Sequence, residues 1–194
     1  MATAAAGSVT ADRILDIAER LVQTRGYNGF SYADIAAELC ITKASLHYHF
    51  ASKGRLGERL VERYHARFMA VLAEIETTEG DAVGRLSAYA AVYARVLESG
   101  RICLCGMLAT DYRTLPDPVQ ERVRAFFAAN HAWLGAVVAD GQASARITFV
   151  GSLEDAARLM LSALEGAMLV AHALGDPEHF RAASEALLRG LHGR

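Results

Sequence analysis

Residues 30–56, FSYADIAAELCITKASLHYHFASKGRL, carry the most informative helix signals in the sequence. Ser31 and Asp34 have the S/T-x-x-D/E spacing, in which a hydroxyl caps the first amides of a helix and a carboxylate lies near its positive end. A second helix start follows at Thr42, a good N-cap residue before the run that ends at Phe50. The spacing predicts two short helices that are separated by three residues.

A longer helix is predicted just before this stretch. From Thr10 onward, apolar residues recur at three- and four-residue steps, and Arg25-Gly26 supplies a basic last turn followed by a left-handed cap. One longer helix followed by two short ones has the proportions of a helix-turn-helix. Such a unit binds double-stranded DNA by placing its last helix in the major groove.

The two faces of the last predicted helix differ in character. At about 100° per residue, Leu46 and Phe50 point inward, toward the apolar positions Ile35, Ala36 and Leu39 of the helix before it. The outer arc carries Lys43, Ala44, His47 and Tyr48. In the major groove a lysine donates to guanine, and a small residue lets the backbone approach and touch a thymine methyl.

These residue types predict two roles at a DNA interface, base reading and phosphate binding. We expect Lys43, Ala44 and His47 to read base edges. Short donors, aromatic hydroxyls and cations at helix starts and flanks hold phosphates and set register. The residues of this kind are Ser31, Tyr32, Thr42, Ser45, Tyr48, His49 and Lys53. Ser31 and Thr42 would also be N-caps in any helical protein, so a purely structural role stays open for both.

The same string closely resembles the signature of TetR-family transcriptional repressors. The resemblance covers residues 10–60, and the remainder matches the family only in helix count and length. The sequence departs from the family pattern at Cys40, where glycine is usual in the turn, and at Gly54-Arg55, where an acidic pair is common. The resemblance implies a DNA-binding domain over 1–55 and a ligand-binding and dimerisation domain over 56–194.

Composition favours an all-α protein without a membrane span. The chain has 194 residues, of which 53% are hydrophobic and 22% charged, and its three prolines all lie after residue 115. The N-terminus lacks the basic start and apolar core of a signal peptide, and no run of ~20 apolar residues is uninterrupted, so we expect a cytoplasmic protein. The net charge of −2 does not indicate a nucleic-acid partner, although the small positive excess lies early in the chain.

Start and stop signals predict six further helices, about nine in all, and no confident strand. They are expected over Ser52–Ile75, Asp81–Ser99, Cys103–Tyr112, Asp117–Gly141, roughly 22 residues from Ser152, and Asp176 to the C-terminus. Ser152 and Asp155 repeat the capping pattern of Ser31 and Asp34. Asp117 and Asp176 each precede a proline, which suits the first helical position.

No catalytic motif is present. The sequence lacks the G-x-S-x-G, H-E-x-x-H, P-loop and dinucleotide-binding patterns, so neither an enzyme nor a bound cofactor is predicted. His47 and His49 diverge by about 200° on a helix, so no shared metal site is predicted.

Large and polarisable residues in the second half predict a cavity for a small, apolar effector. They are Tyr89, Tyr93, Cys105, Met107, Leu108, Phe126, Phe127, Asn130 and Trp133. Each of them could instead belong to an ordinary core, and that alternative stays open.

The helix expected from Ser152 is apolar nearly all round, and such a surface is not left to water. The family resemblance implies that this helix and the last one pair with their copies in a homodimeric four-helix interface. Burial of both helices in a monomer core is the alternative. We therefore expect a homodimeric repressor that binds a pseudo-palindromic operator and is released by a small effector.

The alternative function is a redox or electrophile sensor built on the same DNA-binding unit. Cys103 and Cys105 lie near a predicted helix start beside Arg101, where the pKa of a thiol falls. Two residues apart on a helix, the sulfurs face different ways, so modification of one is expected rather than a disulfide. Burial as small hydrophobic residues is the plainer alternative for both cysteines.

Overall fold

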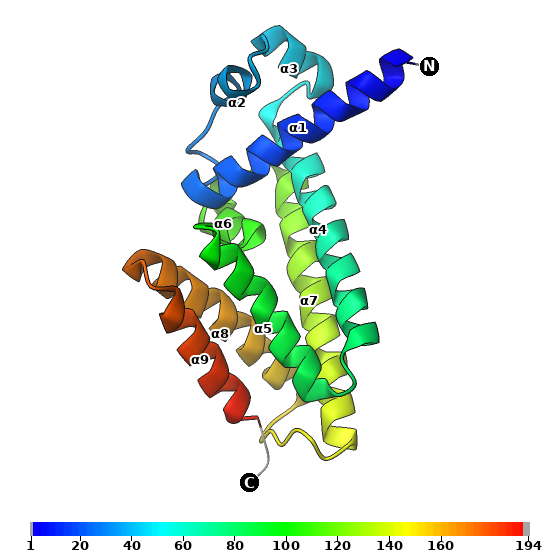
Figure 1. Cartoon of the computed structure of the whole chain (residues 1–194), viewed down its shortest axis with the longest axis vertical. Helices are drawn as coiled ribbons and strands as arrows, with labels where there is room; N and C mark the ends of the chain where they lie inside the picture. Colours follow the sequence, from blue (N-terminus) through cyan, green and yellow to red (C-terminus); the bar gives the residue numbers. More distant parts are fainter. Residues whose placement is uncertain (1, 192–194) are drawn as a thin grey trace. The chain divides into compact units, whose positions relative to one another are not determined.

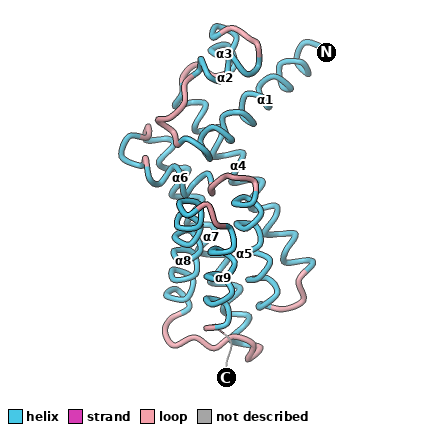
Figure 2. Tube along the Cα trace, turned by 60° about the vertical axis from the view of Figure 1, so that its left-hand side comes forward, coloured by secondary structure: helices cyan, strands magenta, loops and turns pink. Residues whose placement is uncertain are grey.

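The computed structural model describes residues 2–191 and contains, within that range, nine α-helices, one 3-10 turn and no strand. In chain order the elements are α1 (Ala2–Arg25), α2 (Tyr32–Leu39), α3 (Lys43–His49), α4 (Lys53–Thr78), α5 (Ala82–Glu98), α6 (Leu104–Thr110), the 3-10 turn η1 (Tyr112–Thr114), α7 (Asp117–Ala143), α8 (Leu153–Leu174) and α9 (Pro177–Arg189). Figures 1 and 2 show these helices, and the all-α prediction is confirmed for the described residues.

The helices form two compact units. One comprises Met1–Ala66 and Leu104–Arg124, and the other comprises Arg67–Cys103 and Ala125–Arg194. We call them the N-terminal unit and the C-terminal unit. The long helices α4 and α7 each contribute a segment to both. The boundary predicted at residue 55 separates a DNA-binding part of the chain from a ligand-binding and dimerisation part. This division by binding role stays a prediction.

The N-terminal unit is built on α1, α2 and α3. These three helices contact one another, with α2 and α3 side by side (Figure 1), and α1 also contacts α6. Ile14, Ile35 and Leu46, one from each helix, have no exposed surface. Ala36 is buried as predicted, whereas Leu39 is only half-buried because it lies in the last turn of α2.

The helix caps predicted from the sequence are present. The Ser31 hydroxyl accepts from an early amide of α2 at 3.2 Å, and the Asp34 carboxylate accepts from the Ser31 N–H at 2.7 Å. The hydrogen bonds from Ser31 hold the pKa of Asp34 below its usual value. Thr42 caps α3 by accepting from an amide at 3.1 Å, and Ser152 with Asp155 forms a capping box at α8.

Several helix ends differ from the prediction. α1 begins earlier, at Ala2, because the alanine-rich start favours a helix. α4 continues to Thr78, and α6 is confined to Leu104–Thr110 because η1 follows it. α7 includes Asp117, since the Pro116 carbonyl already accepts from the first amides of that helix.

Cys40 ends α2 in the left-handed backbone conformation. Its φ is 54° and its ψ is 40°, and its N–H closes the helix by bonding to the carbonyls of Ala36 and Ala37. This conformation costs an L-residue about 1–2 kcal/mol, because the Cβ atom crowds the following carbonyl. The steric cost explains why glycine is the usual residue at such a turn.

We expect Cys40→Gly to raise the free energy of unfolding by about 1 kcal/mol, because glycine adopts the left-handed conformation without that cost. Cys40→Ala keeps the cost and serves as the matched control. Urea denaturation followed by circular dichroism compares the three proteins. Equal stability of the glycine and alanine variants would contradict this account of the turn.

The C-terminal unit includes α5, α8 and α9. α8 packs against α9, and both contact α5. The side chains of Leu86 on α5, Met160, Leu164 and Met168 on α8, and Phe180 on α9 are almost completely buried in its core. In Figures 1 and 2, α8 and α9 lie beside each other in this unit.

A second apolar face of α8 remains uncovered. Leu159, Val170 and Leu174 are between 47% and 62% exposed, although the opposite face of the helix is buried. By length and composition, α8 is the one helix among the described residues that could cross a membrane, with a mean hydropathy of 1.3. A soluble helix with one face in a core passes the same test, so this pattern is a weak sign of a membrane span.

Candidate functional site

α3 presents an exposed polar face above a buried apolar one. Leu46 has no exposed surface, and Phe50, which follows the helix, is buried as predicted. The exposed residues of α3 are Lys43, Ala44, His47 and Tyr48. Ser45 and His49 are half-buried at its edges. The side chains expected to read bases therefore share one open face.

An open pocket of about 380 Å³ adjoins this face at the start of α2. It is lined by Phe30, Ser31, Tyr32, Ala33, Lys43, His47 and Lys53. Two ammonium groups and the positive end of a helix dipole make the pocket suited to an anion. Phosphate groups of DNA are anions that accept hydrogen bonds from lysine side chains and helix N-termini, as this pocket could offer.

Two of the hydroxyls expected at phosphates are engaged within the protein. The Tyr32 hydroxyl donates to the Phe50 carbonyl at 2.8 Å, and burial, with a smaller effect of Tyr27, raises its pKa to about 12. The Ser31 hydroxyl donates to the Asp34 carboxylate at 2.7 Å. Because these bonds use the hydroxyl hydrogens, both side chains brace the start of α2, and contact of either with DNA stays a prediction.

The Lys53 ammonium also makes contacts inside the N-terminal unit. It donates to the Phe30 carbonyl and lies 4.3 Å from the centroid of the Phe30 ring and 4.8 Å from that of Tyr27. Burial lowers the pKa of Lys53, and Asp111 and Asp34 oppose that effect. Lys53 therefore stabilises the segment between α1 and α2.

Asp111 holds the same segment from a distant part of the chain. One oxygen of its carboxylate accepts from the Tyr27 N–H at 2.8 Å and from the Asn28 N–H at 3.3 Å. The Asn28 side chain donates to the Thr114 hydroxyl at 2.8 Å. Gly26 has φ +78°, and a Cβ there would meet the carboxylate at 2.9 Å. Sequence reasoning missed this clamp, because no local pattern links residues so far apart.

Five of the residues expected at an effector site lie together in the C-terminal unit. The Tyr89 and Tyr93 hydroxyl oxygens are 3.0 Å apart, and Tyr89 donates to the Asn130 side-chain oxygen at 2.8 Å. The Tyr89 ring stacks on Trp133 at 5.4 Å, and the Phe126 ring is fully buried. These side chains contact one another as a packed polar and aromatic cluster.

The other members of the expected set are placed differently. Cys105, Met107 and Leu108 lie on α6 in the N-terminal unit, and Phe127 is half-buried on α7. Sequence reasoning missed Phe68 of α4, whose ring contacts those of Tyr89, Tyr93 and Phe126. It also missed Glu165, because a single acidic residue in an apolar helix reads as an interruption.

The cysteines proposed as sensors are inaccessible. Cys103 is 2% exposed and Cys105 is completely buried, whereas Cys40 is exposed. The Cys103 N–H donates to the Met168 sulfur at 3.1 Å, so this segment is covered by α8. Burial of both sulfurs disfavours a thiol-based sensor and agrees with their role as small hydrophobic residues.

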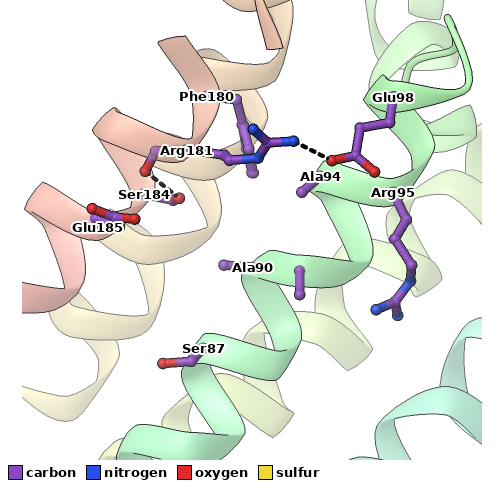
Figure 3. A pocket seen from close by; sticks show the side chains of 10 residues that line it. Ser87, Ala90, Ala94, Arg95, Glu98, Phe180, Arg181, Ser184 and Glu185 are labelled. Carbon is purple, nitrogen blue, oxygen red and sulfur yellow. Dashed lines mark hydrogen bonds and ion pairs between the residues drawn. The ribbon is translucent and has the colours of Figure 1, made fainter. Parts of the chain in front are cut away.

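An open groove of about 310 Å³ lies between α5 and α9 (Figure 3). Ala90 and Ala94 of α5 and Phe180 of α9 line it. At its rim Arg181 pairs with Glu98, as the dashed line in Figure 3 shows. The rim charges therefore neutralise each other, and the groove lacks the convergent polar groups of a specific ligand site.

Two family models match this chain. Residues 14–60 match the model of bacterial regulatory proteins of the tetR family, and residues 82–187 match the tetracyclin repressor-like C-terminal domain. The first covers the helix-turn-helix elements, and the second, which spans more than half of the chain, covers α5 to α9.

Solved structures of the same family are similar over nearly the whole chain. A TetR-family regulator from Agrobacterium tumefaciens is 35% identical, with a TM-score of 0.94, over 96% of this chain and 100% of that one. A TetR regulator from Legionella pneumophila is 31% identical, with a TM-score of 0.83, over 92% of this chain and 95% of the other.

Curated relatives match over shorter stretches. The biofilm operon negative transcriptional regulator IcaR of Staphylococcus aureus is 45% identical over 51 residues, 26% of this chain and 27% of IcaR. The transcriptional repressor DhaR of a Mycobacterium species is 28% identical over 104 residues, 53% of this chain and 52% of DhaR. The matches thus span about a quarter and about half of these relatives. Both family models and the two structures together show that the chain belongs to the TetR family, whose members are DNA-binding regulators and not enzymes.

Proposed function

We propose that this protein is a transcriptional repressor that binds a pseudo-palindromic DNA operator as a homodimer and is released by a small-molecule effector. The observation that carries the proposal is the open face of α3, where Lys43, Ala44 and His47 stand above a buried Leu46. A capped helix with such a face fits the major groove. IcaR and DhaR are named as a negative regulator and a repressor, which supports repression.

Within this proposal, the residues of the interface have two roles. Lys43, Ala44 and His47 read base edges. The pocket beside α3 receives a phosphate, with Lys43 and Lys53 supplying positive charge. Thr42, Ser45, Tyr48 and His49 contact the backbone around it, and Ser31 and Tyr32 fix the geometry of the pocket.

A second copy of the chain covers the exposed face of α8. Leu159, Val170 and Leu174 form an apolar strip that one copy leaves open, and α8 also contacts α9. Pairing of α8 and α9 with their copies makes an isologous four-helix interface. The dimer then sets the spacing between two α3 helices, so that they enter successive major grooves in the bacterial cytoplasm.

The effector acts through the C-terminal unit. The cluster around Tyr89, Asn130 and Trp133 combines aromatic surface with a few polar groups, which is the usual composition of a small-molecule site. An effector that binds one conformation better shifts the population toward it. Release from DNA follows when that conformation separates the two α3 helices by the wrong distance.

Lys43→Ala and Lys53→Ala test the roles at the DNA interface. We expect Lys43→Ala to weaken operator binding by about 1–3 kcal/mol and to relax base preference, because Lys43 reads a base. We expect Lys53→Ala to weaken binding to every DNA duplex by a similar factor. The slope of the logarithm of the binding constant against the logarithm of the salt concentration should become shallower by about one. Lys53→Ala should also lower thermal stability, because Lys53 packs on the rings of Tyr27 and Phe30.

Fluorescence anisotropy at several salt concentrations, with a selected operator and a scrambled duplex, measures these differences. The assignment fails if Lys43→Ala weakens the two duplexes equally, or if both variants lose the same specificity.

A further inference from the structure

The C-terminal unit contains a carboxylate whose two oxygens are buried and poorly satisfied by hydrogen bonds. Glu165 lies on α8, and both of its carboxylate oxygens are buried without a hydrogen-bond partner. Burying an ionised carboxylate without a partner costs free energy, unless the carboxylate is protonated or accepts a hydrogen bond. Burial accordingly raises the pKa of Glu165 to about 7, and the nearby Cys103 thiol and Tyr93 hydroxyl oppose the shift only in part.

Counting hydrogens shows why the neighbours satisfy Glu165 only in part. The Asn130 amide donates to the Phe126 carbonyl at 2.9 Å, so its oxygen is the group that accepts from Tyr89 at 2.8 Å. That bond uses the one hydroxyl hydrogen of Tyr89, and the 3.0 Å contact between the two tyrosines must therefore use the hydrogen of Tyr93. Tyr93 has one hydrogen, so its hydroxyl cannot donate to Tyr89 and to Glu165 at the same time.

The remaining neighbour is a poor donor. A thiol donates weakly, so Cys103 cannot replace a strong hydrogen bond to an ionised carboxylate. The titratable groups that act on Glu165, Tyr89 and Tyr93 come from α5, from α8 and from the segment before α6, and all of them are acids. Within the described part of the chain, no lysine, arginine or histidine contributes to these shifts.

The surroundings of the cluster suit a positive charge. The ring centroids of Tyr89, Tyr93 and Phe126 each lie within 6.2 Å of the ring centroid of Phe68. The faces of aromatic rings attract ammonium groups, and tyrosine oxygens accept hydrogen bonds from them. At the other end of the cluster the Trp133 ring nitrogen donates to a second carboxylate, Glu76, at 2.8 Å.

We propose that Glu165 is the binding site for the ammonium group of a lipophilic organic amine, which is the effector of the repressor. This inference rests on the proposed function and narrows the effector to one chemical class. The ammonium supplies the strong donor that Glu165 lacks, and the hydrocarbon part of the ligand packs on the aromatic cluster. A neutral apolar ligand would leave Glu165 unpaired, and an anion would be repelled.

The same geometry links binding to a conformational change. The rings of the cluster touch one another, so a ligand beside Glu165 must separate side chains that pack together in this structure. A ligand shifts an equilibrium only through contacts that differ between two states. Here the differing contacts are the packing of the cluster, which is lost, and the ion pair with Glu165, which is gained.

Matched amines and alcohols test the inference on the full-length protein. We use 4-phenylbutylamine with 4-phenylbutan-1-ol, and adamantylmethylamine with adamantylmethanol, and measure binding by isothermal titration calorimetry. Each amine should bind about tenfold tighter than its alcohol or better, because only the amine forms a buried ion pair. At pH 7 each amine should release about half a proton from Glu165, whose pKa is about 7, as titrations in buffers of different ionisation enthalpy show.

Two variants of Glu165 and one control variant test whether the preference for amines depends on this carboxylate. Glu165→Gln and Glu165→Met should lose the preference for amines and the proton release, while circular dichroism shows that the helices persist. Glu154→Gln, at an exposed position on the same helix, should keep both. Equal binding of amines and alcohols, no binding of either amine, or an unchanged preference in the Glu165 variants overturns the inference. The proposed function is judged separately, because operator binding by the ligand-free protein needs none of these compounds.

Discussion

We expect Val170→Asp to convert the proposed homodimer to monomers and to weaken operator binding by about 100-fold or more. Val170 is 47% exposed on the apolar strip of α8 in one copy of the chain. In an isologous interface, one substitution places two charges in the buried contact, and each costs several kcal/mol to desolvate without a partner. A monomer contacts one half-site, so it loses the combined affinity of two linked recognition helices.

Val150→Asp is the matched control for this experiment. Val150 is 96% exposed in the segment between α7 and α8, outside the pairing surface. The same chemical change there should leave the dimer and its operator affinity intact. Sedimentation velocity and fluorescence anisotropy compare the two variants with the wild-type protein. A Val170→Asp protein that remains dimeric and binds the operator normally would refute the proposed interface.

Glu165→Gln changes how stability depends on pH. The pKa of Glu165 is raised from 4.5 to about 7 in the folded protein, so between these values the folded state holds more protons than the unfolded one. The stability of the wild-type protein therefore falls as pH rises through this window, and the loss is nearly complete at about pH 8, one unit above the folded-state pKa. The linkage relation gives about 3 kcal/mol for the whole window.

Glutamine cannot ionise, so the variant does not undergo this loss. We expect the variant to gain about 2.5 kcal/mol relative to the wild-type protein between pH 5 and pH 8, because part of the loss occurs below pH 5. Glu154→Gln, an exposed neutralisation on the same helix, should follow the wild-type pH dependence. Chemical denaturation at a series of pH values gives the comparison. Parallel curves for the wild-type protein and Glu165→Gln would show that Glu165 ionises normally in the folded state.

Local features of the sequence were predicted well because their causes are local. Ser31 with Asp34, and Ser152 with Asp155, cap helices through bonds between residues three apart. Helical periodicity likewise identified the buried Leu46 and the exposed Tyr48, which lie on opposite faces of α3. These signals, together with the family resemblance, were enough for the fold class and for which residues of α3 are buried and which are exposed.

Features that depend on contacts between distant residues could not be predicted. The sequence places Asp111 near the end of a short predicted helix. In the structure its carboxylate accepts hydrogen bonds from the backbone amides of Tyr27 and Asn28. Glu165 reads as a charge that interrupts an apolar helix, yet its oxygens are buried. The sequence shows that Tyr89 and Trp133 are large and apolar, but only the structure shows that they stack on each other.

Selection of binding sites from a pool of random duplexes tests whether the protein binds a pseudo-palindromic operator as a dimer. The purified protein is incubated with the pool, bound duplexes are amplified and sequenced over several rounds, and the selected duplex is titrated to obtain its stoichiometry. The account predicts a pseudo-palindrome with half-site centres about one helical turn apart or somewhat more, bound by the dimer. It also predicts that Lys43→Ala enriches the same site with weaker preference at one base position of each half-site. A pool that shows no enriched sequence, or a single half-site bound by a monomer, would contradict it.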